Sequence, residues 1–453
     1  MTNRPADPTR RDFVKAGMAA GAALAIIPVQ PLSPALAAPA ESALPFAAPP
    51  LEKVRIGFVG VGGMGMVHVQ NLLHIKGAEI TAVCDIVEAK VAAAQDKIVA
   101  AGFARPAGYS RGPRDFERMC QEEELDLVYT ATPWEWHVPV CLAALKAGKH
   151  AATEVPAAYT VDDCWELVET AEKTRRHCVM MENCCYGRSE MLMLNMVRQG
   201  VFGEILHGEG GYLHDLRRIK FSDDGEGLWR RAHAMRRNGN LYPTHGLGPI
   251  AQCMDINRGD RFEYLVSMSS NARGLRLYAA EHFPEGDPRR NERFVLGDVN
   301  TALIRTANGR TIYVGHNCDS PRPYSRINLL QGTRGIFSGY PDRLHVEGRS
   351  PAHQWEPVEK YYEQYEHPLW KSEEIRNETS GHGGMDFLED LRLIECLLAG
   401  EPTDQNVYDA AAWSVITPLT ERSVANRSRS MDVPDFTRGK WKTMPPLGIV
   451  GVD

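Results

Sequence analysis

The chain has 453 residues, of which 43% are hydrophobic and 24% are charged, and its formal net charge is −7. This composition excludes a disordered chain, which would carry fewer apolar residues and more net charge. The length allows about two or three domains, and the acidic balance gives no electrostatic footprint for nucleic acid. The ten cysteines form neither a CxxC pair nor a zinc-binding spacing, so we predict no metal site.

Residues 1–51 are predicted to be an export signal and a linker. The stretch Thr9-Arg10-Arg11-Asp12-Phe13-Val14-Lys15 is followed by an apolar run over 16–29 and by the A-x-A site Ala35-Leu36-Ala37. This order is typical of a signal peptide, and the run is too short for a comfortable membrane span. The paired arginines resemble a twin-arginine signal, so we expect a periplasmic protein that passes through the twin-arginine export machinery. The alternative is a cytoplasmic protein with a frayed N-terminus.

Residues 52–186 are predicted to form a Rossmann domain that binds NAD. A buried-strand pattern over 54–59 leads into Gly60-Val61-Gly62-Gly63-Met64-Gly65 and then into a helical stretch. A GxGxxG fingerprint in this context holds a pyrophosphate at a helix N-terminus. A second strand pattern ends at Asp85, whose carboxylate can accept hydrogen bonds from the adenosine ribose and would repel the extra phosphate of NADP. The expected cofactor is therefore NAD.

Strand and helix patterns alternate up to residue 186, which predicts a parallel sheet covered on both faces. Ligands of such sheets bind beyond the carboxyl ends of the strands. We therefore expect residues at the strand ends to contact the cofactor. They are Trp134, Glu135, Trp136, His137, Glu154, Val155 and Asn183.

Residues 187–453 are predicted to form an α+β substrate domain whose large open sheet is mostly antiparallel. Helical patterns over 385–399 and 407–425 are expected to pack back on the Rossmann domain. The predicted fold class is thus α/β, a doubly wound parallel sheet joined to an α+β domain. The strand patterns of the second part cover 205–213, 264–270, 301–307, 311–317 and 326–331.

Several motifs resemble the glucose-fructose oxidoreductase/inositol dehydrogenase family. They are the glycine fingerprint, Thr132-Pro133 followed by His137, and Ala147-Gly148-Lys149-His150 leading into Glu154-Val155-Pro156. The dehydrogenases of that family carry a catalytic lysine in the middle of a Glu-Lys-Pro motif, where this chain has Val155. A valine cannot transfer a proton, so this position counts against ordinary alcohol oxidation.

Longer stretches look like glycoside hydrolase family 109, over nearly the whole mature chain. This resemblance implies an NAD-dependent α-N-acetylgalactosaminidase that acts on a glycan ending in N-acetylgalactosamine. Gly63-Met64 departs from the more polar pair expected in many relatives. The matching stretches are 154–158, 182–186, 237–249, 320–326, 381–386 and 435–439.

Such a hydrolase takes a hydride from C3 of the sugar and later returns it. It also needs a base for the C3 hydroxyl, a base for the C2 proton and an acid for the leaving group, which is eliminated from C1 before water adds there. The candidate catalytic residues are Tyr242, His245, Tyr186 and His382. We expect Tyr242-Pro243-Thr244-His245 to lie in a Gly/Pro-rich loop, with Pro243 fixing one backbone dihedral. The candidate substrate contacts are Tyr212, Arg230, Tyr242, Pro243, Thr244, His245 and Tyr324.

These candidates also have purely structural interpretations. His245 would then be a core or capping histidine, Tyr186 an aromatic cover of a strand end, and His382 a turn residue. Trp134 and Trp136 would then pack the seam between domains rather than the cofactor.

Three functions stay open at this point. The leading one is an exported NAD-dependent glycosidase. The alternative is an exported NAD(P)-dependent sugar oxidoreductase of the wider family, and the third is a cofactor-binding protein without activity. The sequence leaves the natural glycan, the anomer preference and the oligomeric state undecided, and it is compatible with a homo-oligomer.

Overall fold

The computed structural model describes residues 48–450 apart from 373–374 and 376–379. The predicted export signal therefore lies outside the described residues. Within them, no helix combines the length and the apolar character that crossing a membrane requires.

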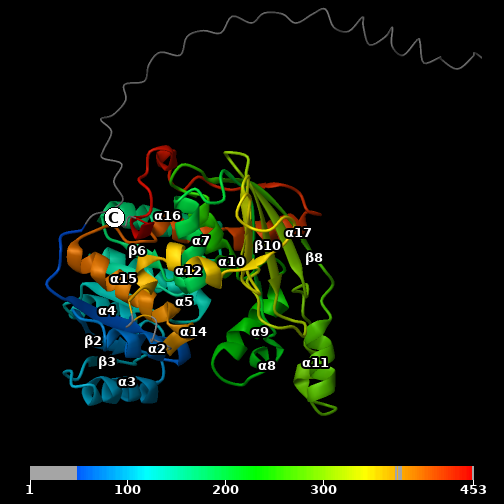
Figure 1. Ribbon diagram of the computed structural model, residues 1–453. Helices are drawn as coiled ribbons and strands as arrows, with labels where there is room; N and C mark the ends of the chain where they lie inside the picture. Colours follow the sequence, from blue (N-terminus) through cyan, green and yellow to red (C-terminus); the bar gives the residue numbers. More distant parts are fainter. Residues whose placement is uncertain (1–47, 373–374, 376–379, 451–453) are drawn as a thin grey trace, which may run out of the picture. The chain divides into compact units, whose positions relative to one another are not determined.

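The N-terminal part, blue to cyan in Figure 1, is built on a six-stranded parallel sheet. Its strand order is β3-β2-β1-β4-β5-β6, the order of the doubly wound dinucleotide-binding fold. The expected doubly wound sheet is thus confirmed. The strands are β1 (Val54–Val59), β2 (Ala78–Cys84), β3 (Ala107–Tyr109), β4 (Leu127–Thr130), β5 (His150–Thr153) and β6 (Cys178–Met180).

Helices cover this sheet, and every residue of β4, of β5 and of the edge strand β6 is buried. Continuous apolar strands are what a sheet packed on both faces requires. Helix α5 begins earlier than predicted, so Trp134 to His137 form its first turn rather than a loop. The helices are α2 (Gly63–Leu72), α3 (Glu88–Ala100), α4 (Asp115–Glu122), α5 (Trp134–Lys146) and α6 (Val161–Thr174).

The C-terminal part is built on a nine-stranded sheet in the order β14-β13-β12-β11-β7-β10-β9-β8-β15. The pairing is antiparallel except between β7 and β10, which confirms the mostly antiparallel expectation. The strands are β7 (Ile205–Leu213), β8 (Phe262–Ser269), β9 (Asn300–Thr306), β10 (Thr311–Asn317), β11 (Leu329–Gly332), β12 (Gly335–Ser338), β13 (Arg343–Val346), β14 (Glu356–Pro357) and β15 (Met431–Asp432).

The start of β11 differs from the prediction, and the burial pattern of β9 shows how the sheet is covered. Strand β11 begins later than predicted because Ile327 and Asn328 have positive φ values of 65° and 53°, which a strand cannot accommodate. Strand β9 alternates strictly between buried and exposed residues. This alternation is typical of a sheet that is covered on one face and exposed on the other.

The remaining helices lie around the second sheet or return to the first. They are α7 (Arg188–Arg198), α8 (Arg217–Lys220), α9 (Glu226–Arg236), α10 (Thr244–Cys253), α11 (Gly274–His282), α12 (Glu359–Tyr365), α14 (Ser380–Gly383), α15 (Met385–Ala399), α16 (Val407–Ser414) and α17 (Ile416–Ala425). Short 3₁₀ turns are η1 (Asn183–Tyr186), η2 (Pro288–Asn291), η3 (Pro368–Trp370), η4 (Lys440–Lys442) and η5 (Gly448–Val450).

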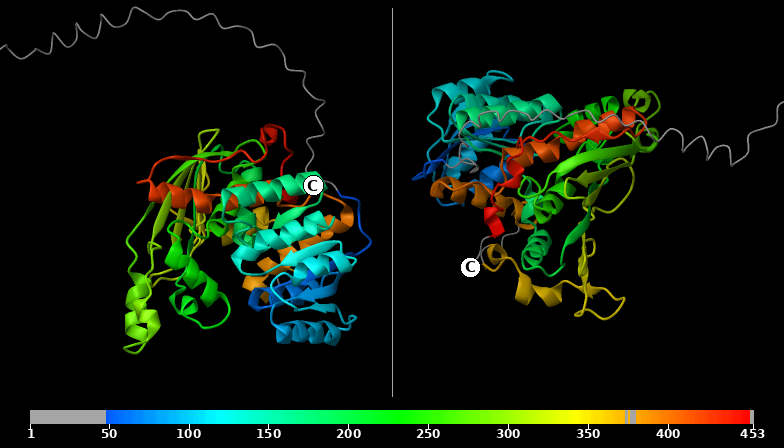
Figure 2. Two further views of the ribbon diagram at one scale, coloured as in Figure 1. Left: turned by 180° about the vertical axis from the view of Figure 1, so that it is seen from behind. Right: turned by 90° about the horizontal axis from the view of Figure 1, so that it is seen from above.

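The C-terminal helices connect the two sheets. Helix α15 packs on α2 and α16 packs on α6, while α17 lies along β8. The views from behind and from above show the orange α15 beside the blue α2 and the red α17 along the second sheet (Figure 2). The predicted helix over 407–425 is in fact two helices, which meet at Val415.

Helix α10 was predicted as a loop, and that prediction was wrong. Thr244 and His245 occupy its first turn although glycines and Pro249 follow. The glycines serve close packing instead of flexibility: a Cβ on Gly246 would lie 1.9 Å from the backbone nitrogen of Gly211 in β7. Only glycine allows the helix to approach the strand so closely, and this contact brings His245 next to the end of β7.

Candidate active site

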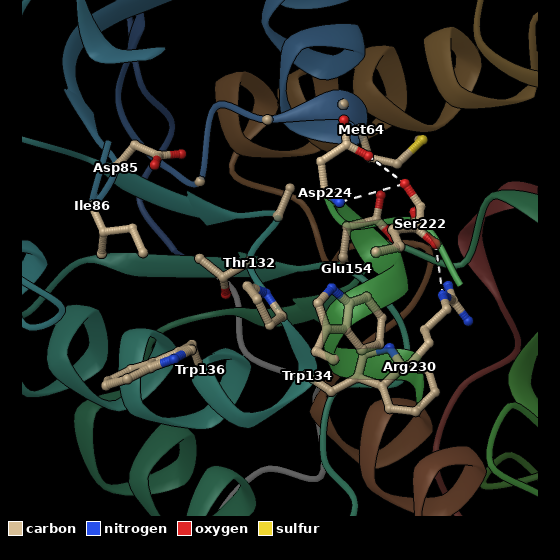
Figure 3. Close-up of a pocket in the computed structure, with 18 of the residues that line it drawn as sticks. Met64, Asp85, Ile86, Thr132, Trp134, Trp136, Glu154, Ser222, Asp224 and Arg230 are labelled. Carbon is tan, nitrogen blue, oxygen red and sulfur yellow. Dashed lines mark hydrogen bonds and ion pairs between the residues drawn. The ribbon is translucent and has the colours of Figure 1, made fainter. Parts of the chain in front are cut away.

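A pocket of about 1140 Å³ lies at the carboxyl ends of the Rossmann strands, opposite the segment that holds α8 and α9 (Figure 3). Its place agrees with the general position of ligands in such sheets. Many of the predicted cofactor and substrate residues line it. They are Gly60, Gly62, Gly63, Met64, Asp85, Trp134, Trp136, His137, Glu154, Val155, Arg230 and Tyr242.

The phosphate loop has the geometry that a pyrophosphate needs. Gly60 has a φ of +84°, and a Cβ there would lie 2.8 Å from the carbonyl oxygen of Ala131. A Cβ on Gly65 would lie 1.9 Å from the carbonyl oxygen of Gly60, whereas one on Gly63 would meet nothing within 4 Å. The first and third glycines thus shape the turn, and the surface at Gly63 is left open for a ligand. These residues fit the pyrophosphate of a dinucleotide.

Asp85 stands at the end of β2 and is fixed by backbone hydrogen bonds. Its Oδ2 accepts one from the N–H of Val61 at 3.1 Å, and its Oδ1 accepts one from the N–H of Val87 at 2.9 Å. The carboxylate is held at the adenosine side of the pocket, beside Ile86 (Figure 3). A ribose with two free hydroxyls fits this acceptor.

The opposite end of the pocket, at the ends of β4 and β5, gathers aromatic rings around a buried arginine. The guanidinium carbon of Arg230 lies 5.2 Å from the ring centre of Trp134, 4.7 Å from that of Trp229 and 5.1 Å from that of Tyr242. Burial would lower the pKa of Arg230, but the adjacent Glu226 carboxylate outweighs it and the pKa is raised. Arg230 is therefore a permanent cation held among π-faces.

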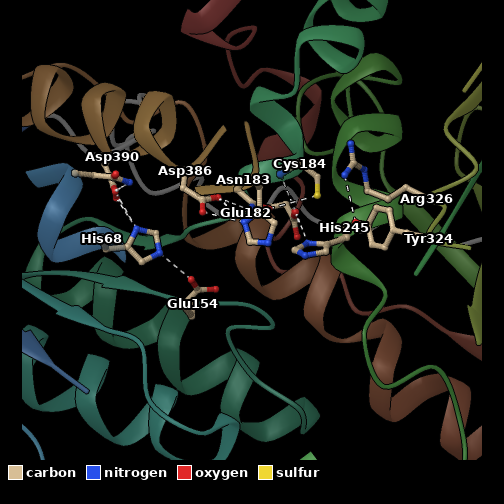
Figure 4. A network of polar contacts seen from close by, with 12 residues as sticks. His68, Glu154, Glu182, Asn183, Cys184, His245, Tyr324, Arg326, Asp386 and Asp390 are labelled. Carbon is tan, nitrogen blue, oxygen red and sulfur yellow. Dashed lines mark hydrogen bonds and ion pairs between the residues drawn. The ribbon is translucent and has the colours of Figure 1, made fainter. Parts of the chain in front are cut away.

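Tyr242 links this pocket to a cluster of tyrosine and histidine rings. Its ring centre lies 4.8 Å from that of His245 and 4.5 Å from that of Tyr212. Nδ1 of His245 donates to the buried carboxylate of Glu182, 2.7 Å away (Figure 4). Burial raises the pKa of Tyr242 well above its ordinary value, so its hydroxyl keeps its proton in the unliganded site and can donate it.

Tyr324 and the start of α10 complete this cluster. The ring of Tyr324 lies 6.2 Å from that of Tyr212, and its hydroxyl accepts a hydrogen bond from Arg326 at 3.2 Å. Pro243 caps α10 with a φ of −75°. The hydroxyl of Thr244 is buried and has no hydrogen-bond partner within the described part of the chain. The predicted substrate residues are thus brought together, although apart from Arg230 and Tyr242 they lie beyond the pocket lining itself.

The structure does not bring Tyr186 into this site. Its hydroxyl is buried and donates to Asp404 at 3.2 Å, on the far side of η1. Tyr186 instead borders a separate cavity of about 10 Å³ together with Glu389. We therefore remove it from the candidate catalytic residues, because its hydroxyl is buried against Asp404 and the residue does not line the pocket.

Three further predicted residues lie outside the pocket lining. Asn183 donates to Asp386 at 2.6 Å. His382 has a side chain that is 53% exposed, and its hydrogen bond with Asp386 raises its pKa. Glu135 lies on the outer side of α5, 4.0 Å from His233. Their side chains belong to the surroundings of the pocket and not to its walls.

Glu182, Cys184 and His245 offer ligand atoms that all lie within 4.8 Å of one another, a spacing that could hold a metal ion. In the structure these atoms are engaged with protein partners. Glu182 accepts from His245 at 2.7 Å, and Cys184 donates to Asn183 at 3.3 Å. The contacts present are those of a hydrogen-bonded network.

Sequence reasoning missed the outer wall of the pocket. Apart from Arg230, which was predicted, this wall consists of lining residues between 218 and 229 from α8, α9 and the segment that joins them, together with residues of α11. Lys90 of α3 was also missed, although its amine lies 3.7 Å from the position of a Cβ on Gly62, over the phosphate loop. No local pattern marks these residues. Those of α8, α9 and α11 reach the cofactor pocket only through the packing of the second half against the first, and Lys90 reaches it through the packing of α3 on β2 and β3.

Each half of the chain matches a known protein family. Residues 186–443 match the family described as "Glycosyl hydrolase 109, C-terminal domain", and residues 54–182 match "Oxidoreductase family, NAD-binding Rossmann fold". The chain belongs to glycosyl hydrolase family 109. A family 109 protein of Shewanella baltica (strain OS185) is 48% identical over 98% of this chain and 99% of its own length. One from Shewanella sp. (strain MR-4) is 49% identical with the same coverage.

Family 109 membership and the NAD-binding match confirm the resemblance noted in the sequence and the expected cofactor, NAD. The protein is an NAD-linked enzyme that modifies sugars. A levoglucosan dehydrogenase solved with NADH and L-sorbose shares its fold, with a TM-score of 0.65 and 19% identity, over 85% of this chain and all of that one. An NAD-binding oxidoreductase from Klebsiella pneumoniae has the same TM-score at 16% identity, over 85% of this chain and 100% of its own.

Proposed function

We propose that the chain is an NAD-dependent glycosidase that hydrolyses terminal α-linked N-acetylgalactosamine or a similar sugar. One observation carries the proposal: Val155 and Tyr242 line the same pocket, and the ring of Tyr242 lies next to the His245–Glu182 pair. Net oxidation of an alcohol needs one proton acceptor at the carbinol, and Val155 supplies none. Hydrolysis through a transient ketone needs several proton transfers, and tyrosine and histidine suit them.

Bound NAD+ would supply a reversible hydride acceptor for C3 of the sugar, while a base other than Val155 takes the C3 hydroxyl proton. The resulting ketone would acidify the C2–H, so that loss of the C2 proton expels the protonated aglycone from C1. Water would then add at C1, and return of the hydride and the proton to C3 would leave no net oxidation after turnover. His245, held through Nδ1 by Glu182, is proposed to take the C2 proton with Nε2. Tyr242 is proposed to donate a proton to the leaving group, since it keeps that proton at neutral pH. Arg230 and the rings of Tyr212 and Tyr324 are proposed to hold the hydroxyl and acetamido groups.

The first test uses nitrophenyl α-N-acetylgalactosaminide with and without added NAD+. The proposal expects release of nitrophenol with no accumulation of NADH. Net NADH formation would instead identify a sugar oxidoreductase, and a lack of any reaction with a panel of α- and β-linked sugars would identify a protein that binds the cofactor without catalysis.

The second test concerns the C2 proton. Hydrolysis in D2O is expected to place deuterium at C2 of the released sugar, because the proton that His245 removes exchanges with solvent. A glycosidase that uses two carboxylates leaves that position untouched. Mass spectrometry of the sugar distinguishes the two, and a product without deuterium at C2 would contradict the proposed mechanism.

We also propose that the protein is exported in its folded state with NAD already bound. Support comes from the arginine pair Arg10-Arg11, the apolar run and the A-x-A site. The mature protein, purified from the periplasm without added cofactor, is expected to release nicotinamide nucleotide when denatured. Replacing Arg10 and Arg11 with lysine is expected to leave the precursor in the cytoplasm, and unimpeded export of that variant would contradict the signal assignment.

A further inference from the structure

Glu154 lines the pocket at the end of β5, and a buried histidine contacts it from the protein interior. Its Oε1 accepts a hydrogen bond from Nε2 of His68 at 2.8 Å, and its Oε2 accepts one from the backbone N–H of Val155 at 3.2 Å. The side chain of Glu154 lines the pocket and is 18% exposed, whereas that of His68 is 1% exposed. His68 therefore touches Glu154 from the protein side.

The other ring nitrogen of His68 is fixed by Asp390 of α15. The Nδ1 atom lies 2.9 Å from Oδ2 of Asp390, and the same oxygen accepts a hydrogen bond from Asn71 at 2.9 Å. The hydroxyl of Tyr129 donates to Oδ1 of Asp390 at 3.1 Å. These contacts tie the phosphate-loop helix α2 to strand β4 and to the C-terminal helix α15 (Figure 4).

The charges in this chain of contacts support one another. Burial would lower the pKa of His68, but the carboxylates of Asp390 and Glu154 raise it well above its ordinary value. In turn, burial would raise the pKa of Glu154, but the hydrogen bond from His68 lowers it. Glu154 is therefore ionised, and the cation that compensates it is His68, since the adjacent Val155 brings no charge.

We propose that His68 and Asp390 form a positioning dyad that holds the Glu154 carboxylate toward the nicotinamide half of NAD. A glutamate side chain has three rotatable bonds, so an acceptor aimed at one ligand atom needs an anchor that cannot move. The end of β5 borders the half of the dinucleotide that carries nicotinamide. The ribose hydroxyls and the carboxamide N–H of that half are the donors a carboxylate accepts. The inference rests on the cofactor contact expected for Glu154, not on hydrolysis of a sugar.

The experiment is a double-mutant cycle on NAD+ binding by the full chain, measured by equilibrium dialysis after bound cofactor is removed. His68→Gln and Glu154→Gln are each expected to raise the dissociation constant by about 10–100-fold. The double variant is expected to bind as Glu154→Gln does, because His68 acts through Glu154. The control is His74→Gln, an exposed histidine just after α2 whose side chain bonds the carbonyl oxygen of Gln70, and wild-type affinity is expected.

Two results would overturn the dyad. One is wild-type NAD+ affinity in His68→Gln. The other is a loss of binding free energy in the double variant that equals the sum of the losses in the two single variants. If His68→Gln fails to fold, Asp390→Asn takes its place, because it keeps the volume of the side chain and removes its charge. The same cycle with Glu154→Gln is then expected to be non-additive, and full additivity there would also overturn the proposal. The measurement uses NAD+ and no sugar. The result of the binding cycle can therefore be interpreted even if the glycosidase proposal fails.

Discussion

The imidazole of His245 and the carboxylate of Glu182 form a hydrogen bond of 2.7 Å between Nδ1 and Oε1. Glu182 is fully buried, and its second oxygen has no partner among the described residues. The carboxylate therefore fixes the orientation of the ring and leaves Nε2 as the nitrogen able to exchange protons with a ligand. This pairing of a histidine with a buried acid is the arrangement that general bases use.

Removing either member of this pair is expected to slow hydrolysis without releasing NAD. His245→Ala should lower turnover by about 10²–10⁴-fold, and Glu182→Gln by at least about tenfold, because the ring loses its anchor. Initial rates with a nitrophenyl sugar and the NAD content of the same preparations check this. His207→Ala serves as the control, since that histidine lies on β7 and contacts Thr311. Full activity in both pair variants would show that the base lies elsewhere.

Substituting two glycines of the phosphate loop by alanine is expected to have different effects on stability and on NAD binding. In Gly65→Ala the new methyl would lie 1.9 Å from the carbonyl oxygen of Gly60, whereas in Gly63→Ala it would meet nothing within 4 Å. We expect Gly65→Ala to cost about 1–3 kcal/mol of folding free energy and to weaken NAD binding. Gly63→Ala should fold as the wild type does. Chemical denaturation and NAD titration of both variants measure the difference, and equal behaviour would contradict the loop geometry.

The activity is expected to depend on the planar guanidinium of Arg230, which lies among aromatic rings. Arg230→Lys keeps the charge but loses the stacking on Trp134, Trp229 and Tyr242. A desolvated contact of this kind contributes about 1–2 kcal/mol, so kcat/KM should fall by about tenfold. Arg231→Lys is the matched control, because the next residue along α9 pairs with Glu292. An unchanged kcat/KM in Arg230→Lys would exclude a binding role for the guanidinium.

A buried histidine of β10 is expected to contribute to acid sensitivity. Burial, together with the charges of Lys220 and Arg230, lowers the pKa of His316 to about 3. The native state keeps this ring neutral, whereas the unfolded chain protonates it below about pH 6.5. The contribution of His316 to the free energy of unfolding is therefore fully present above about pH 6.5 and is lost as the pH falls toward 3.

His316→Leu should remove this dependence. Between pH 7 and pH 5 the wild type is expected to lose about 2 kcal/mol more unfolding free energy than the variant. Urea denaturation at the two pH values measures both losses. Equal losses would mean that His316 is not neutral in the native protein.

The sequence by itself determined the elements whose patterns are local. The glycine fingerprint, the acid at Asp85 and the strand at 205–213 could be found because spacing and alternation along the chain specify them. The family could be found for the same reason, since its motifs are continuous stretches. Residue types also limited the chemistry, because Val155 cannot carry a proton whatever fold surrounds it.

The tertiary structure decided which of the candidate residues meet. Tyr186 and Glu182 lie four residues apart, yet one hydroxyl faces Asp404 and the other side chain reaches His245. No periodicity predicts this, because the short turn η1 sends successive side chains to different partners. Likewise, the glycine-rich stretch after Thr244 is a helix whose Gly246 packs against Gly211 of β7, where a Cβ would clash. Packing between residues far apart in the sequence stabilises these conformations, and a local sequence pattern does not predict it.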